Sequence, residues 1–189
     1  YGSIDKPTFL WAGGWYINTF YKLLGMRRTP WNIRFDPPAP DELGEYEYTV
    51  YLDGHKIEVA VEGKGSYFSS IEADGDKIFT AVNPTVRRSL KLHRGVPEYP
   101  YLAEAACITG RIEYDPENAQ LSVIFVGEPG QQVYYVVVSP LPLEAVYKPG
   151  VNAKVASDRI MSGAGYRYTI RFVLQASEEQ HTLNFIRSG

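Results

Sequence analysis

The chain has 189 residues, a length that favours a single domain. Its 44% apolar and 22% charged residues are ordinary for a globular protein, which argues against a disordered chain or a coiled coil. The net charge of −3 lacks the basic surplus of a dedicated nucleic-acid binder, so no nucleic-acid partner is expected. The longest strictly apolar run, residues 133–138, is far shorter than the roughly 18–20 residues that cross a bilayer, so no transmembrane segment is expected.

Cysteine usage limits the chemistry of the chain. Cys107 is the only cysteine, so neither an intramolecular disulfide nor a thiolate zinc site can form. The chain begins at Tyr1 rather than Met, which leaves secretion or processing in an organelle open, although no disulfide supports it. Compartment and oligomeric state stay open at this stage.

The predicted elements are mostly strands. Residues 18–26 have the spacing of one or two helical turns, and apolar and polar side chains alternate from about residue 45 onward, which is typical of antiparallel strands. Turn residues at 53–54, 74–76 and 115–118 and a strand-ending proline pair at 140–142 divide this region. The pattern predicts strands over residues 46–52, 56–62, 66–71, 77–82, 105–114, 120–126, 132–139, 166–174 and 182–186, and a second short helix over 152–161.

This pattern predicts an all-β protein, an antiparallel meander of about eight to ten strands with one or two short helices. A meander of this kind forms either a sandwich or a closed barrel, and closure removes the exposed sheet edges. We expect the barrel, as a single β-barrel domain over residues 1–189, because of the N-terminal residues.

Residues 9–17 carry a resemblance to a known family. Gly13, Gly14 and Trp15, followed by Tyr16, supply a Gly-x-Trp signature, and residues 110–114, 121–125 and 133–137 are similar to a run of central strands. In these features the chain resembles the lipocalins of the calycin superfamily, as an atypical member without a disulfide. The resemblance implies a calycin-like barrel whose first strand, over residues 9–17, carries the Gly-x-Trp signature. It also implies that the Trp side chain seals the barrel base against a basic residue near the last strand.

In this sequence the first candidate for that basic partner is Arg187, and Arg171 is the second. A Trp ring stacked on a guanidinium group contributes about 0.5–2 kcal/mol and would close the barrel base against water.

The dense basic stretch at residues 87–94 contains two candidate functional residues, Arg87 and His93. One interpretation is a solvated edge strand in which Lys and Arg prevent aggregation. The other is a cationic rim that steers an anionic ligand, such as a carboxylate, into the barrel. The remaining histidines, His55 and His181, lie in turn sequences and are expected to be solvated, so no metal site is expected.

Tyrosine is abundant, with 15 residues, many of them in predicted strands. Tyrosine suits half-buried strands in general, but it also lines pockets in which its hydroxyl orients a ligand. Tyr48 and Tyr135, with Val123 and Phe125 as an apolar wall, are therefore the candidate ligand-binding residues, together with Arg87.

Three functions remain open. The first is binding or transport of a small hydrophobic ligand, such as a pigment, fatty acid or terpenoid, inside the barrel. The second is a barrel enzyme that needs no cofactor, a cyclase, isomerase or dehydratase, for which His93, Arg87 and Tyr135 are the residues to test. The third is a β-sandwich interaction module with a filled interior.

Overall fold

The computed structural model describes residues 6–29, 32–37, 43–52, 54–106, 109–148, 157–162, 165–174 and 181–188. In this part of the chain one helix, α1 (Lys6–Leu23), precedes the strands. The strands are β1 (Met26–Arg28), β2 (Ile33–Phe35), β3 (Tyr46–Leu52), β4 (His55–Gly63), β5 (Phe68–Ala73), β6 (Asp76–Lys77), β7 (Ser89–Arg94), β8 (Tyr101–Ala105), β9 (Thr109–Asp115), β10 (Gln120–Phe125), β11 (Gln132–Ser139), β12 (Leu143–Lys148), β13 (Ser157–Ser162), β14 (Gly165–Val173) and β15 (His181–Arg187).

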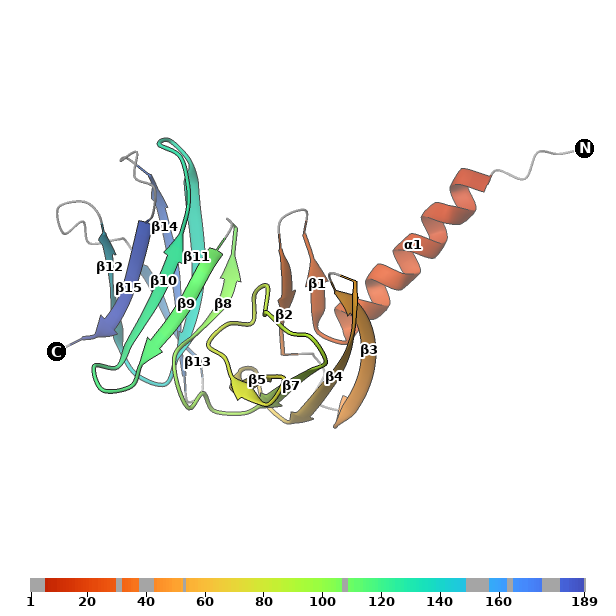
Figure 1. Ribbon diagram of the computed structural model, residues 1–189, viewed down its shortest axis with the longest axis horizontal. Helices are drawn as coiled ribbons and strands as arrows, with labels where there is room; N and C mark the ends of the chain where they lie inside the picture. Colours follow the sequence, from red (N-terminus) through yellow and green to blue (C-terminus); the bar gives the residue numbers. More distant parts are fainter. Residues whose placement is uncertain are drawn as a thin grey trace, which may run out of the picture.

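The strands form four open sheets, drawn in Figure 1. Their strand orders are β1-β2, β3-β4-β7-β5-β6, β13-β14-β11-β8 and β12-β15-β10-β9. The mostly β composition confirms the predicted class, but none of the sheets that the described strands form closes, so the prediction of a calycin-like closed barrel is wrong. The reason is topological: the chain leaves the meander order, because β4 pairs in parallel with β7 and β10 pairs with β15.

The turns predicted at residues 53–54, 74–76 and 115–118 each join two paired strands, but the strand predicted over 77–82 is wrong, because β6 ends at Lys77. Leu52 pairs with His55 at the end of the β3–β4 ladder, Ala73 pairs with Asp76 in β5–β6, and Gln120 pairs with Asp115 in β10–β9. The alternation in β4 also holds, since Ile57, Val59 and Val61 are buried while Lys56 and Glu58 are exposed. Local turn chemistry and period-two patterning therefore determine these pairs.

The basic stretch does not form an edge strand. It forms β7, which lies inside its sheet between β4 and β5. Leu90 and Leu92 are buried in the core, and Arg94 is also buried, where its guanidinium donates to the carbonyl of Gly65. The edge-strand interpretation of residues 87–94 is therefore wrong.

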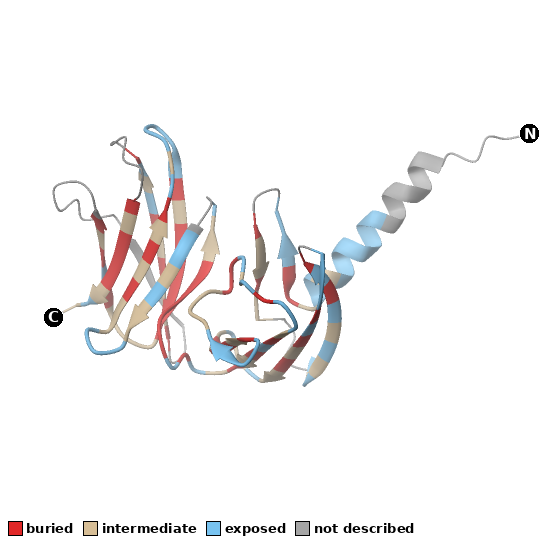
Figure 2. Cartoon of the chain, in the orientation of Figure 1, coloured by how far each residue is buried: buried red, intermediate tan, exposed pale blue. Residues whose placement is uncertain are grey.

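The sheet β13-β14-β11-β8 is a middle layer between the other two large sheets (Figures 1 and 2). On β11, Val136 and Val138 belong to the hydrophobic core shared with the five-stranded sheet, whereas Tyr135 and Val137 belong to the core of the sandwich with β12-β15-β10-β9. Both faces of β11 are covered, which explains why residues 133–138 form a continuous apolar run rather than an alternating one.

The segment 79–83 joins the β1–β2 hairpin to the middle layer by backbone hydrogen bonds. The amide of Phe35 donates to Ala81, and the amide of Ala81 donates to Leu102 of β8. The hairpin is therefore fixed to the β8 edge of the sandwich by main-chain contacts.

Helix α1 projects away from the sheets (Figure 1). The last turn of the helix contacts the sheets. Tyr21 packs on the hydrophobic core of the five-stranded sheet, and just after the helix the carbonyl of Leu24 accepts a hydrogen bond from the hydroxyl of Tyr46. Gly25 follows with a φ of 83°, a backbone conformation that suits glycine at a helix C-terminus. The helix therefore includes residues 9–17, which the family resemblance implied would be a strand, and the predicted helix over 18–26 ends earlier, at Leu23.

The second predicted helix, over residues 152–161, is also wrong in its described part. Residues 157–161 lie in β13, which pairs with β14, and residues 152–156 lie outside the described residues. Cys107 and Asp53 also lie outside them.

Candidate functional site

The predicted apolar wall is part of the sandwich core. Val123, Phe125 and Tyr135 are at most 1% exposed, and the rings of Phe125 and Tyr135 lie 5.4 Å apart in edge contact. These side chains pack against one another and against the facing sheet in the buried core of the sandwich, and they do not line an open groove.

The three residues singled out for catalysis lie in three different places. Tyr135 is buried in the sandwich, Arg87 lies in the loop before β7, and His93 lies on the outer face of the five-stranded sheet. There the imidazole of His93 sits between two carboxylates, with Nδ1 3.2 Å from Glu62 and Nε2 3.7 Å from Glu72. The structure therefore does not bring these three side chains into one site.

Tyr48 lies on the inner face of β3, where its ring stacks on that of Tyr46 with centroids 6.2 Å apart. Its hydroxyl is buried and has no hydrogen-bond partner. Burial, and secondarily the neighbouring Tyr46 and Tyr21, raise the pKa of Tyr48 well above its ordinary value. The ring of Tyr48 packs against the hydrophobic core of the five-stranded sheet.

The residues of the family signature are far apart. Gly13 and Trp15 lie on α1, at one end of the molecule, and Arg187 ends β15 at the other (Figure 1). The side chain of Trp15 is 73% exposed. The second candidate partner, Arg171, lies over the ring of Tyr134 on the middle sheet, 5.3 Å from its centroid. Trp15 therefore seals no barrel base.

His181, expected to be a solvated turn residue, is fully buried at the start of β15. Its Nδ1 lies 2.7 Å from the hydroxyl of Tyr147, and its Nε2 lies 3.2 Å from the carbonyl of Gly127. The carbonyl only accepts, so Nε2 carries the proton and Nδ1 accepts from Tyr147. Both ring nitrogens are satisfied, which makes this histidine a structural member of the sandwich core.

A groove of about 490 Å³ lies between the β1–β2 hairpin, the turn that joins β3 to β4, and the loop before β7. Arg28, His55 and Arg87 line it from these three elements. No aspartate or glutamate is among its described lining residues, and neither guanidinium group pairs with another described residue. We call this the cationic groove. Its side chains can attract and orient an anionic group.

A second groove of about 500 Å³ adjoins it on the side of α1. Its lining includes Ile17 and Tyr21 from the helix, Met26 from β1 and Val50 from β3. We call this the apolar groove. Arg28, Ile33 and Leu52 line both grooves, so the two share one wall.

Hydrogen bonds hold in place the loop before β7, which forms one side of the cationic groove. The carboxylate of Asp74 accepts from the backbone amides of Arg87, Arg88 and Ser89 at 2.8, 2.8 and 3.0 Å. These bonds, above all that from Ser89, lower the pKa of Asp74 below its ordinary value. The position of Arg87 therefore depends on a carboxylate in the β5–β6 turn.

On the opposite side of the groove, two asparagines connect the hairpin to the rest of the protein. Asn83 donates to the side-chain oxygen of Asn32 at 2.7 Å and accepts from the amide of Ile33 at 2.8 Å. Asn32 in turn donates to the carbonyl of Ala105 at 2.5 Å. Neither asparagine could be identified from the sequence, because their polar side chains lie in short turns that show no periodic pattern.

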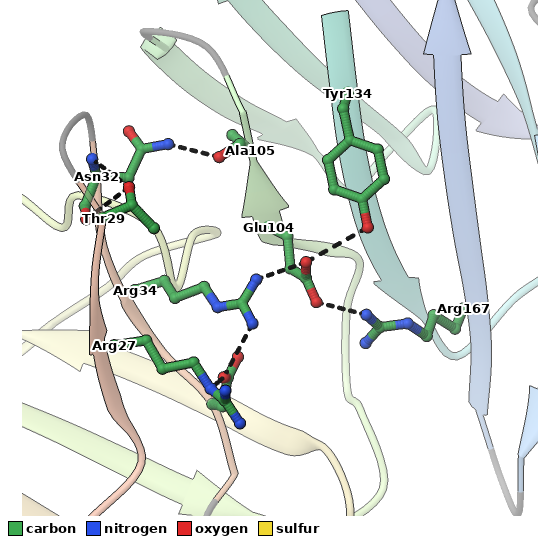
Figure 3. Close-up of polar contacts among 9 residues, drawn as sticks. Arg27, Thr29, Asn32, Arg34, Glu104, Ala105, Tyr134 and Arg167 are labelled. Atoms are coloured by element: carbon green, nitrogen blue, oxygen red, sulfur yellow. Dashed lines mark hydrogen bonds and ion pairs between the residues drawn. The ribbon is translucent and has the colours of Figure 1, made fainter. Parts of the chain in front are cut away.

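Below the hairpin, Glu104 of β8 lies between Arg34 and Arg167, and Tyr134 donates to the same carboxylate (Figure 3). Arg34 also contacts Asp36, which pairs with Arg27. Burial is the largest influence on Glu104 and raises its pKa, but the two arginines outweigh it and hold the pKa below its ordinary value. Each of the two carboxylates, Asp36 and Glu104, pairs with two arginines, although the buried Nε of Arg34 has no hydrogen-bond partner among the described residues. Because the ion pairs of Glu104 join three strands, we assign the cluster a structural role.

No group of three or more His, Cys, Asp or Glu side chains with metal-binding geometry is present in the described part of the chain. Among the described residues, no helix is both long enough and apolar enough to cross a membrane. A scan against protein-family models, a search of curated proteins and a search of solved structures each returned no match. The resemblance to lipocalins at residues 9–17 and 105–138 therefore stays a prediction.

Proposed function

We propose that the protein binds a small amphipathic anion, with its charged head in the cationic groove and its apolar chain in the apolar groove. The observation that carries the proposal is the wall shared by the two grooves, formed by Arg28, Ile33 and Leu52. A ligand lying across this wall would meet a positive charge on one side and aliphatic side chains on the other.

The head group would be recognised by Arg28 and Arg87. Both side chains are exposed, they come from different elements, and their guanidinium groups have no partner among the described residues. Asn32 and Asn83 are already hydrogen-bonded to each other, so they keep the groove in shape. A carboxylate, sulfate or phosphate would supply the acceptors that the two arginines lack.

The apolar chain would lie along Ile17, Tyr21 and Val50, between α1 and β3. The groove has a volume within the range of roughly 300–1,000 Å³ that is usual for small-molecule sites. This proposal keeps the predicted small apolar ligand and the predicted role of Arg87, but it moves the site from an interior to an open groove.

The test is a calorimetric titration of the full chain with decanoate, decyl sulfate and decanol. We expect the two anions to bind and decanol to bind at least about tenfold more weakly, because it lacks the charge that the arginines recognise. Arg28→Gln and Arg87→Gln should each lower the affinity for decanoate about tenfold.

Arg88→Gln is the matched control, because Arg88 is exposed next to Arg87 but does not line the groove. It should leave binding unchanged. Equal affinity for decanoate and decanol, or equal losses in the Arg87 and Arg88 variants, would overturn the assignment of the head group to this groove.

A further inference from the structure

The outward face of α1 carries large apolar side chains in solvent. Trp15, Tyr16 and Phe20 are 73%, 83% and 59% exposed, and Leu23 is 54% exposed. Figure 2 shows the described part of the helix in the colour of exposed residues, projecting from the sheets. Such a surface needs a covering in the functional protein, because exposed apolar patches of this kind mark interaction sites.

The helix has little to stabilise it on its own. Gly13 and Gly14 lie in its middle, where glycine lowers helix propensity, and a side chain added at Gly14 would meet open space. Its sequence contains only Lys6 and Lys22 as charged residues, so it forms no internal ion pair. Most helices in proteins are stabilised by packing of an apolar face, and here that face has no cover.

The distribution of the exposed side chains favours lipid over a protein groove. Successive helical residues are turned by about 100°, so Trp15, Tyr16 and Ile17 extend around more than half of the helix. A protein groove covers one stripe of a helix, whereas this apolar surface is wider. The exposed polar residues Asn18, Thr19 and Lys22 occupy the remaining side, as in a helix that lies in a bilayer interface. Trp and Tyr in particular favour the boundary between acyl chains and head groups.

The charge of this region points to the lipid class. Residues 6–23 contain no aspartate or glutamate. Lys22 lies in the last turn, and the exposed Arg28 follows on β1. Basic residues beside an apolar interfacial helix attract anionic head groups.

From these observations we infer that α1 docks the protein onto the surface of an anionic lipid bilayer, lying in the interface with Trp15, Tyr16 and Phe20 among the head groups and upper acyl chains. The inference does not depend on the ligand-binding grooves, because these three side chains line neither of them.

The test is flotation of the full chain with vesicles of phosphatidylcholine and phosphatidylglycerol, compared with vesicles of phosphatidylcholine alone. We expect binding to the mixed vesicles that weakens as salt increases, and a blue shift of tryptophan emission on binding. The double variant Trp15→Ser with Phe20→Ser should bind at least about tenfold more weakly. Lys22→Glu should weaken binding to the mixed vesicles and leave binding to the neutral ones unchanged.

The matched control is the double variant Val126→Ser with Val173→Ser, which removes two exposed apolar side chains from the sandwich, remote from α1. It should float like the wild type, and circular dichroism should show all variants equally folded. Failure of the wild type to bind the mixed vesicles, or equal binding by the Trp15/Phe20 variant, would overturn the inference. The inference would also be overturned if the wild type were a dimer that does not bind vesicles and the Trp15/Phe20 variant were a monomer. That result would assign the outward face of α1 to a second copy of the chain.

Discussion

Arg34 on β2 reaches Glu104 on β8, with Nη1 2.5 Å from Oε2. Arg167 of β14 holds the other oxygen of the same carboxylate at 2.6 Å. The carboxylate thereby connects the N-terminal hairpin, which forms part of both grooves, to the middle sheet of the protein. The position of the hairpin therefore depends on an ion cluster that is mostly shielded from solvent.

Glu104→Gln should lower the free energy of unfolding by about 2 kcal/mol, because it removes the charged partner of Arg167 and one of the two charged partners of Arg34. Urea denaturation measures the change. The control is Glu98→Gln, which breaks the exposed Lys77–Glu98 pair and should cost less than about 1 kcal/mol. Equal costs for the two variants would contradict a structural role for the Glu104 cluster.

The contribution of Glu104 should also depend on pH. Its pKa in the folded protein is lowered, so the ionised carboxylate adds stability above the unfolded-state pKa of about 4.3, and this stability is lost as the pH falls through the folded-state pKa. The difference in unfolding free energy between wild type and Glu104→Gln should therefore be constant near neutral pH and shrink below about pH 4. A difference that grows on acidification would contradict the sign of the shift.

Because both faces of β11 are buried, we expect substitutions on either face to destabilise the protein. Val136→Ala and Val137→Ala should each lower the free energy of unfolding by about 1.5–3 kcal/mol, because each removes buried methyl groups from a different core. Val126→Ala, at an exposed position, should change it by less than about 0.5 kcal/mol. If Val136→Ala were as mild as this control, the middle sheet would have one solvent-facing side.

Asp74→Asn should loosen the loop that carries Arg87. The substitution removes the charged acceptor of three backbone amides, while asparagine still tolerates the φ of 54° at this position. Hydrogen exchange of the amides of residues 87–89 should become faster, and decanoate affinity should fall several-fold, as for a less ordered site.

Asp115→Asn is the control for this variant, because Asp115 makes the same kind of turn contacts in the β9–β10 hairpin. It should accelerate exchange in its own turn and leave residues 87–89 unchanged. Unaltered exchange of those amides in the Asp74 variant would show that the loop is held by other contacts.

Much of the local structure could be predicted from the sequence. Alternating residues such as Ile57 and Val59, and the turns between adjacent strands, depend on neighbours in the chain, and these hairpins are confirmed. The connectivity between hairpins could not be predicted, because the parallel pairing of β4 with β7 depends on contacts between residues such as Val59 and Leu90 that are far apart in sequence.

The candidate site was predictable only in part. Arg87 was identified because it lies in a conspicuous basic stretch, whereas Arg28 and Asn32 come from a short hairpin with no strong pattern. Residues 9–17 lie in α1 and not in the strand that the family resemblance implies. Ile17 and Tyr21, about one helical turn apart, share one face of α1 and line the apolar groove.

The binding site is tested most directly by amide chemical shifts of the isotopically labelled protein during titration with decanoate. We predict that the shifts cluster at residues 28, 33, 52 and 87, along the wall shared by the two grooves, and saturate together. Shifts centred on Val123, Phe125 and Tyr135 in the sandwich core, with none at residues 28 and 87, would contradict the proposed site.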